Sequence, residues 1–291
     1  MEAIHTLEEH AILSSHQTVL KDQSISIEEV IEQLTDIVTT CKQKNSKLGY
    51  FAVLYLFVTH VIKKNIEQGN FEDNKRMEVL DVIFAKRYID AFEQWNAGNK
   101  SAVSESWYVA FEYAEQNQGM IMQHMLLGIN AHINLDLGIA TCETMNDESI
   151  IPIINDFTQI NDILNELTEK VENVVGKYSL YVRLVRKLGN KNLLKMADFS
   201  IAYARTGAWY FAGQYNNSQD KKSSLVSRDA DVAAFGSSFV HPKNPFVNLF
   251  FTVGALCETR SNSGFIDDIL SEMDHVLETK FKVEVDQNAV L

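Results

Sequence analysis

The sequence has few residues that end regular structure, with 3 prolines and 13 glycines among 291 residues, and it has only 3 cysteines. So few turn formers exclude a sandwich or barrel built from many short strands. The cysteines are odd in number and far apart, which is typical of a reduced, cytoplasmic protein. Residues 1–9 contain no basic stretch followed by an apolar core, so we expect no signal peptide.

Positive charge is also scarce, because 26 basic residues stand against 39 acidic ones and give a net charge of −13. This charge repels a phosphate backbone and no basic patch is visible, so we expect no binding to nucleic acid. The longest apolar run, Gly49 to Ile62, is interrupted only by tyrosines, Thr59 and His60. It is too short to cross a bilayer, so we expect a buried helix and no membrane span.

Helical spacing of apolar residues dominates the rest of the chain and predicts an all-α protein. Ser26 and Glu29 form a capping box that opens the first helix. Further helices are expected over about 76–95, 104–115, 120–141, 151–175, 180–188, 193–215, 227–237, 245–258 and 266–277. Residues 216–224 are polar and predict a mobile loop. No long linker occurs, so we expect residues 1–291 to form one bundle of about nine or ten helices.

The stretch from 120 to 141 is the most informative one, since apolar residues surround it on every side of a helix. This pattern predicts a central helix enclosed by others. His132 and Asp136 are one turn apart on one face, whereas Asn130 and Asn134 lie on another. The two asparagines are predicted either to pack against neighbouring backbones or to contact a substrate.

His132 and Asp136 predict a metal site or a structural pair. A buried carboxylate is costly unless a cation or hydrogen-bond donors meet it. The H-x-x-x-D spacing supplies an imidazole nitrogen and a carboxylate oxygen, which suit Zn, Fe or Mn. Alternatively, the two side chains simply hydrogen-bond to each other and fix the packing of the helix.

Other polar residues also face inward in the predicted helices. Asp81 lies in the apolar stripe of its helix, near Tyr88, and either pairs with an arginine or completes the metal site. Asp198, Arg205 and Trp209 share one face of a later helix, with Asp198 about 10 Å from Arg205 along the axis. An arginine beside an indole suits a phosphate with an apolar tail. A structural ion pair of Arg205 with another aspartate is the alternative.

The helix over 151–175 contains Asp156 and then Asn161, Asn165 and Glu169, which are spaced one turn apart on one face. Oxygen ligands in that arrangement can hold Mg²⁺ against a diphosphate. An ordinary amphipathic helix has the same pattern. The chain lacks the common nucleotide-binding, thiol-redox, zincin and α/β-hydrolase motifs.

The string from Leu126 to Leu137, with its N-x-H-I-N-x-D-L motif, resembles an uncharacterised bacterial family catalogued as domain of unknown function 5995. Similar stretches occur at Phe71–Asp73, Leu80–Tyr88 and Asp156–Asn161. The likeness is good from about Ala52 to Leu167 and looser beyond. The family implies no function.

Two enzyme groups share fragments with this sequence. The H-x-x-x-D spacing of His132 and Asp136 resembles the metal-binding helix of zinc-dependent phospholipases C, although Cys142 is followed by no histidine before His241. Asn161, Asn165 and Glu169 resemble the Mg²⁺ motif of class I terpene cyclases, but their aspartate-rich motif is missing. Both groups are all-α.

We therefore expect a metal-dependent hydrolase of a phosphoester or other ester on a small apolar or phosphorylated substrate. His132 and Asp136 would bind a divalent metal, and Asp81 with Asp156 or Asp198 would supply further ligands or the base. Arg205 would bind the anion of the substrate, with Trp209, Tyr88, Asn130 and Asn134 as substrate contacts. A terpene-cyclase-like lyase using Mg²⁺ at Asn161, Asn165 and Glu169, and a non-catalytic scaffold or carrier of an apolar ligand, are the alternatives.

Overall fold

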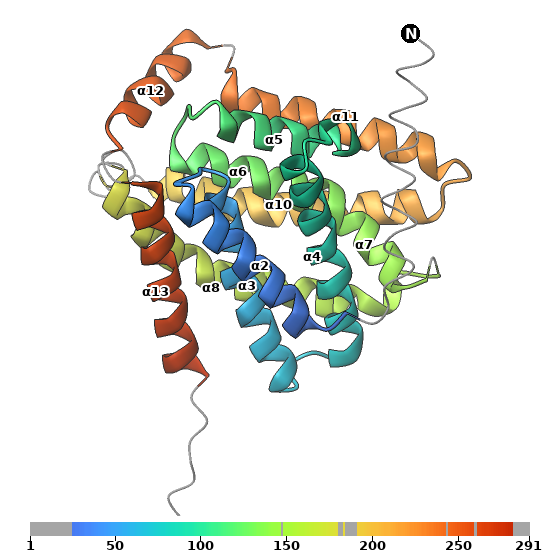
Figure 1. The fold of residues 1–291 in the computed structure, drawn as a ribbon. Helices are drawn as coiled ribbons and strands as arrows, with labels where there is room; N and C mark the ends of the chain where they lie inside the picture. The colour runs from blue at the N-terminus through green and yellow to red at the C-terminus, as the bar shows by residue number, and fades with distance from the viewer. Residues whose placement is uncertain are drawn as a thin grey trace, which may run out of the picture.

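The computed structural model describes residues 25–146, 148–179, 183, 191–242, 244–258 and 261–281. These residues form helices joined by short loops and contain no strand, which confirms the all-α prediction (Figure 1). The helices are α2 (Ile27–Gln43), α3 (Gly49–Glu67), α4 (Asn74–Asn96), α5 (Glu105–Glu115), α6 (Ile121–Ala131), α7 (Leu137–Thr144), α8 (Ile154–Tyr178), α10 (Lys191–Asn216), α11 (Lys221–Val240), α12 (Pro245–Leu256) and α13 (Asn262–Lys280). The helix predicted over 180–188 lies outside the described residues apart from Arg183.

Helix α2 begins at the capping box that its sequence predicts. The Ser26 hydroxyl accepts from the Glu29 backbone N–H at 3.2 Å, and the Glu29 carboxylate accepts from the Ser26 N–H at 2.8 Å. The apolar run of α3 packs against α2, α4, α6, α8 and α13. Because other helices surround α3, its sequence is apolar on nearly every side.

The central helix is not one continuous α-helix, so the prediction over 120–141 is wrong in this detail. A π-helical turn, η2 (His132–Asp136), separates α6 from α7, and the Leu137 N–H donates to the His132 carbonyl across it. Such turns are rare, and the apolar periodicity of a fully enclosed helix does not reveal them. The turn contacts α4, α10 and α11, so it lies inside the bundle.

Close approach of α6 to α3 depends on Gly128. A Cβ atom at this position would lie 2.3 Å from the Phe51 ring, which no real side chain tolerates. Glycine therefore lets the α6 backbone contact an aromatic side chain of α3. This contact brings the central helix against the apolar helix that lines the cavity described below.

The C-terminal connections differ from the sequence-based expectation in one place. The loop predicted over 216–224 is shorter, because α10 continues to Asn216 and α11 begins at Lys221. Asp220 caps α11 by accepting from the Ser223 N–H at 3.0 Å. Helix α12 opens with an Asn244 cap and Pro245, as predicted, and lies at the margin of the molecule in Figure 1. Within the described part of the chain, no helix combines the length and apolarity that crossing a bilayer requires.

Candidate functional site

The π-helical turn places His132 and Asp136 in contact with each other. His132 Nδ1 lies 3.3 Å from Asp136 Oδ2, and both residues are 2% exposed. The predicted pairing of these residues across one helical turn is therefore present. The pair faces α4, because Arg87 of that helix also reaches Asp136.

Asp136 is the centre of a hydrogen-bonded cluster that we call the Asp136 network, formed by Arg87, Trp107, His132, Asp136 and Glu143. Arg87 Nε donates to Asp136 Oδ1 at 3.1 Å, and Trp107 Nε1 donates to Asp136 Oδ2 at 2.8 Å. Arg87 also lies 3.5 Å from Glu143 Oε1. Burial alone would lower the pKa of Arg87, but Glu143 and Asp136 together raise it above its usual value. The buried aspartate thus has a cation and two further donors.

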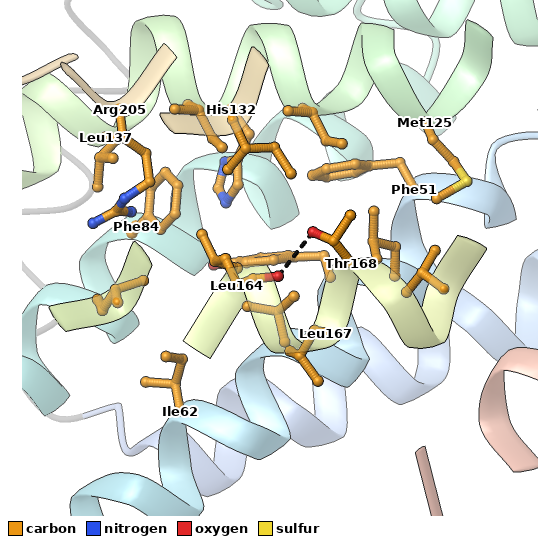
Figure 2. A pocket seen from close by; sticks show the side chains of 18 of the residues that line it. Phe51, Ile62, Phe84, Met125, His132, Leu137, Leu164, Leu167, Thr168 and Arg205 are labelled. Carbon is orange, nitrogen blue, oxygen red and sulfur yellow. Dashed lines mark hydrogen bonds between the residues drawn. The ribbon is translucent and has the colours of Figure 1, made fainter. Parts of the chain in front are cut away.

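An apolar cavity of about 140 Å³ lies beside this network, between α3, α4, α6, α8 and α10. Its lining is almost entirely aliphatic, aromatic or methionine side chains, and the polar exceptions are Tyr55, Asp81, His132, Thr168 and Arg205. Figure 2 shows Arg205 at one end, Met125 and Phe51 at the other, and His132 between them. Leu164, Leu167 and Thr168 of α8 form the opposite wall.

His132 joins the network to the cavity. Its Nδ1 faces Asp136, whereas its Nε2 is buried and has no hydrogen-bond partner. Figure 2 shows the ring directed toward the cavity. The ring stacks on Phe84 with centroids 3.6 Å apart and meets Tyr55 edge-on at 4.4 Å. Burial lowers the pKa of His132 more than Asp136 raises it, so the neutral imidazole is favoured.

Two more polar atoms in the cavity wall have no partner. Asp81 Oδ2 and the Tyr55 hydroxyl are both buried and make no hydrogen bond. Burial, helped by the charge of Glu78, raises the pKa of Asp81 to about 7. Burial also raises the pKa of Tyr55 well above its usual value. In contrast, the Thr168 hydroxyl donates to the Leu164 carbonyl at 2.8 Å (Figure 2).

Arg205 lies at the end of the cavity and is only 3% exposed. Its Nε donates to Asn161 Oδ1 at 2.5 Å, its Nη2 donates to the Phe157 carbonyl, and its guanidinium lies 4.4 Å from the centre of the Phe157 ring. None of the ion pairs between described side chains involves Arg205. Burial lowers its pKa to about 9. The cavity thus contains a buried cation whose described contacts are neutral.

Asp156 lies elsewhere, although the sequence suggested a catalytic role. It is fully buried, accepts from the backbone N–H groups of Glu72 and Asp73, and pairs with Arg76 Nη2 at 2.8 Å. These contacts join the start of α8 to the start of α4. Asp156 does not line the cavity, and its carboxylate has the donors that a structural role requires.

The predicted substrate contacts also lie outside the cavity lining. Asn130 donates to the Val232 carbonyl of α11 at 2.9 Å, and Asn134 donates to Asn130 at 2.9 Å, so both amides face α11. Trp209 packs on Phe157 with ring centroids 5.1 Å apart. Tyr88 is 1% exposed within the aromatic core. The side chain of Asp198 lies outside the described part of the structure.

The three residues predicted to bind Mg²⁺ differ in their exposure to solvent. Asn161 is half-buried and bonded to Arg205, whereas Asn165 and Glu169 are exposed. Along this helix, Phe157, Ile160, Ile163 and Leu167 are buried. The spacing is therefore that of an amphipathic helix, with Asn161 at the boundary between its two faces.

The donor set around His132 does not fit a metal site as the residues lie. No three His, Cys, Asp or Glu side chains in the described ranges converge on one point. A metal between His132 and Asp136 would have to displace Arg87 or Trp107 from the carboxylate. His132 Nε2 is open, but a metal there would need further ligands that the described residues do not bring together.

Sequence reasoning missed the Tyr55 hydroxyl and the partners of Asp136. Tyr55 belongs to the apolar run of α3, where its hydroxyl is one of the few polar groups. A tyrosine inside a fully buried helix needs a partner for its hydroxyl, and this requirement is the signal that could have identified it. Arg87 and Trp107 come from α4 and α5, so only tertiary structure reveals their contact with Asp136.

Comparison with known proteins places the chain in a family but gives no activity. No curated protein and no solved structure matches it. The model of one family, described as a family of unknown function (DUF5995), matches residues 27–242, a range that includes every residue of the cavity lining. This match confirms the predicted family over residues 27–242. The chain therefore belongs to this family of unknown function (DUF5995).

Proposed function

We propose that this protein binds a small amphiphile, with an anionic head group at Arg205 and an apolar tail in the cavity. One observation carries the proposal: a buried arginine without a described carboxylate partner lies in the wall of an otherwise apolar cavity. An unpaired buried charge is costly, and an oxyanion from a ligand would offset that cost. An arginine fork matches a carboxylate or a phosphate.

The shape of the cavity supports the same class of ligand. Arg205 lies at one end, so a tail attached to a head group there would run past His132 toward Met125 (Figure 2). Apolar side chains line this path, and they favour a hydrocarbon over a sugar or a peptide. The protein would act as a carrier or sensor of the amphiphile. Cys41, Cys142 and Cys257 form no disulfide, which agrees with the predicted reducing, cytoplasmic compartment.

Titration of dodecanoate, dodecyl phosphate and dodecanol into delipidated protein tests this proposal. We expect at least one of the two anions to bind more tightly than dodecanol, by about 100-fold, since a charged hydrogen bond in an apolar site is worth about 3 kcal/mol. Arg205→Met should remove this preference. Arg228→Met is the matched control, because Arg228 bonds to the Asn134 carbonyl away from the cavity. Equal affinities for all three compounds would refute the proposal.

The metal-dependent hydrolase predicted from the sequence is the competing proposal. His132 Nε2 supports it, because an open imidazole nitrogen in an apolar cavity can serve as a ligand or a base. The contacts of Asp136 with Arg87 and Trp107 give it less support than the carrier receives. Elemental analysis of purified protein and of His132→Ala tests it. Stoichiometric metal that this substitution removes would favour the hydrolase.

The terpene-cyclase-like alternative receives the least support. Asn165 and Glu169 are exposed, so Mg²⁺ bound there would face water rather than the cavity. Incubation with isoprenyl diphosphates and Mg²⁺ tests this alternative, and formation of a hydrocarbon or alcohol product would favour it.

A further inference from the structure

Three unpartnered polar atoms belong to residues that line this same cavity. They are the Tyr55 hydroxyl, Asp81 Oδ2 and His132 Nε2, and their residues are 4%, 7% and 2% exposed. A buried polar atom without a partner costs about 1–3 kcal/mol, so folded proteins rarely retain several together. Their convergence on one apolar cavity indicates that a bound molecule supplies the missing hydrogen bonds.

The Asp136 network determines which ring nitrogen of His132 can accept a hydrogen bond. Both carboxylate oxygens of Asp136 accept hydrogen bonds, from Arg87 and Trp107, so His132 Nδ1 is the donor in its contact with Asp136. In the neutral imidazole, Nε2 is then a hydrogen-bond acceptor. The ring cannot turn to another partner because Phe84 stacks on it and Tyr55 meets it edge-on. His132 therefore requires a donor from the ligand.

Tyr55 supplies a hydrogen-bond donor, which complements the acceptor nitrogen of His132. Its phenol remains protonated at neutral pH because burial disfavours the phenolate. Its hydroxyl can donate, and its ring is next to that of His132, with centroids 4.4 Å apart. The cavity therefore presents an acceptor and a donor from adjacent rings. A hydroxyl group can pair with both, a ketone can only accept, and a methylene group can do neither.

We propose that His132 and Tyr55 form a second polar subsite, which recognises a hydroxyl group on the tail of the amphiphile. The inference rests on the proposed function, in which Arg205 binds the head group, and it narrows the ligand to hydroxylated fatty acids or hydroxylated alkyl phosphates. Figure 2 shows His132 between Arg205 and Met125, so the hydroxyl belongs along the tail and not at the head. Asp81 faces the same space and adds a further partner.

The test compares dodecanoate with a panel of its monohydroxy and keto derivatives, substituted at successive positions along the tail. The wild-type protein should bind at least one hydroxy derivative about tenfold more tightly than dodecanoate, and more tightly than the keto derivative substituted at the same position, which can pair with Tyr55 alone. Equal affinity of every hydroxy derivative and dodecanoate would mean that the subsite holds only water, and it would overturn the inference.

Two variants test which side chains cause the preference for a hydroxy derivative over dodecanoate. Tyr55→Phe removes only a hydroxyl, and His132→Phe removes the acceptor nitrogen. In each variant, the affinity for the best hydroxy derivative should fall to that for dodecanoate. Tyr88→Phe is the matched control, because the Tyr88 hydroxyl is also buried and unpartnered but Tyr88 does not line the cavity. A preference that survives in Tyr55→Phe and is lost in Tyr88→Phe would contradict the assignment.

Binding of methyl esters distinguishes a failure of this inference from a failure of the proposed function. They lack the anionic head group, so the preference for a hydroxy methyl ester over plain methyl dodecanoate reports the subsite alone. If dodecanoate does not bind but this preference is present, the head-group proposal fails and the subsite is retained. If dodecanoate binds and no hydroxy compound binds more tightly, the subsite fails and the head-group proposal is retained.

Discussion

Two buried arginines in this molecule have opposite surroundings. Arg87 belongs to the Asp136 network and faces two carboxylates, which raise its pKa. Arg205 lies in the cavity wall, bonds to an amide and a backbone carbonyl, and has a pKa that burial lowers to about 9. In the first region, described carboxylates pair with the cation, whereas in the second no described carboxylate pairs with Arg205. The Arg87 side chain is 10% exposed and Arg205 is 3% exposed. Their partners therefore distinguish a structural network from the proposed binding site.

Removal of Arg87 should have the largest effect and would test whether the network is structural. Arg87→Met leaves the Asp136 carboxylate buried without its cation, so we expect the free energy of unfolding to fall by about 3–5 kcal/mol. Urea denaturation followed by circular dichroism measures this loss. A loss below about 1 kcal/mol would show that Asp136 does not depend on Arg87. The control Arg228→Met should cost less, because the described contacts of Arg228 are with the Asn134 carbonyl at 2.8 Å and the Phe211 ring, and no described carboxylate depends on it for an ion pair.

The raised pKa of Asp81 predicts that the free energy of unfolding depends on pH. Its pKa is 3.8 in the unfolded chain and about 7 in the folded protein. The folded state therefore binds the proton more tightly, so the stability from this group is present below about pH 4 and is lost as the pH rises through about 7. Asp81→Asn should be more stable than the wild type at pH 8, relative to pH 4, by up to about 4 kcal/mol. A pH-independent difference in urea denaturation would contradict the assigned shift.

Arg205→Met sharpens the comparison with Arg87. We expect its affinity for an anionic amphiphile to fall about 100-fold, which corresponds to about 3 kcal/mol, since the ligand loses its only buried cation in the described cavity lining. In the absence of ligand, the free energy of unfolding should change by less than about 1 kcal/mol, because removing an unpaired buried charge offsets the lost packing. Urea denaturation without ligand measures this value. A loss as large as that of Arg87→Met would place Arg205 among the structural arginines.

The smallest effect is expected at Asn165 and Glu169. Both side chains are exposed, so Asn165→Ala and Glu169→Ala should change stability by less than about 0.5 kcal/mol and leave amphiphile binding unchanged. Calorimetric titration with Mg²⁺ measures metal binding by the wild type and by the same two variants. Magnesium binding that either substitution abolishes would revive the lyase alternative and weaken the distinction between the two regions.

The sequence predicted most of the fold because helix starts and buried faces depend on local patterns. The capping box at Ser26, the Asn244–Pro245 start of α12 and the enclosed central helix all follow from spacing and residue type. The π-helical turn could not be predicted, since an evenly apolar helix has no face from which a change of period can be read. The early start of α11 depends on Asp220, which resembles any polar loop residue until its cap is visible.

The candidate site was predictable in its residues but not in their partners. The spacing correctly paired His132 with Asp136, and the inward stripe correctly turned Asp81 toward the core. The sequence could not reveal that Arg87 neutralises Asp136 or that Arg76 pairs with Asp156, because these contacts join different helices. The described partners of Arg205 are neutral, and Arg205 lines the cavity of the proposed site.

The coupling between the ligand head group and Arg205 tests the central claim most directly. Calorimetric titration of dodecanoate and methyl dodecanoate into the wild type and into Arg205→Met gives four affinities, whose ratio isolates this one contact. We predict that the wild type favours the acid over its ester by about 100-fold and that the variant favours it by less than about threefold. The same preference in both proteins would contradict the account, since the head group would then bind without Arg205.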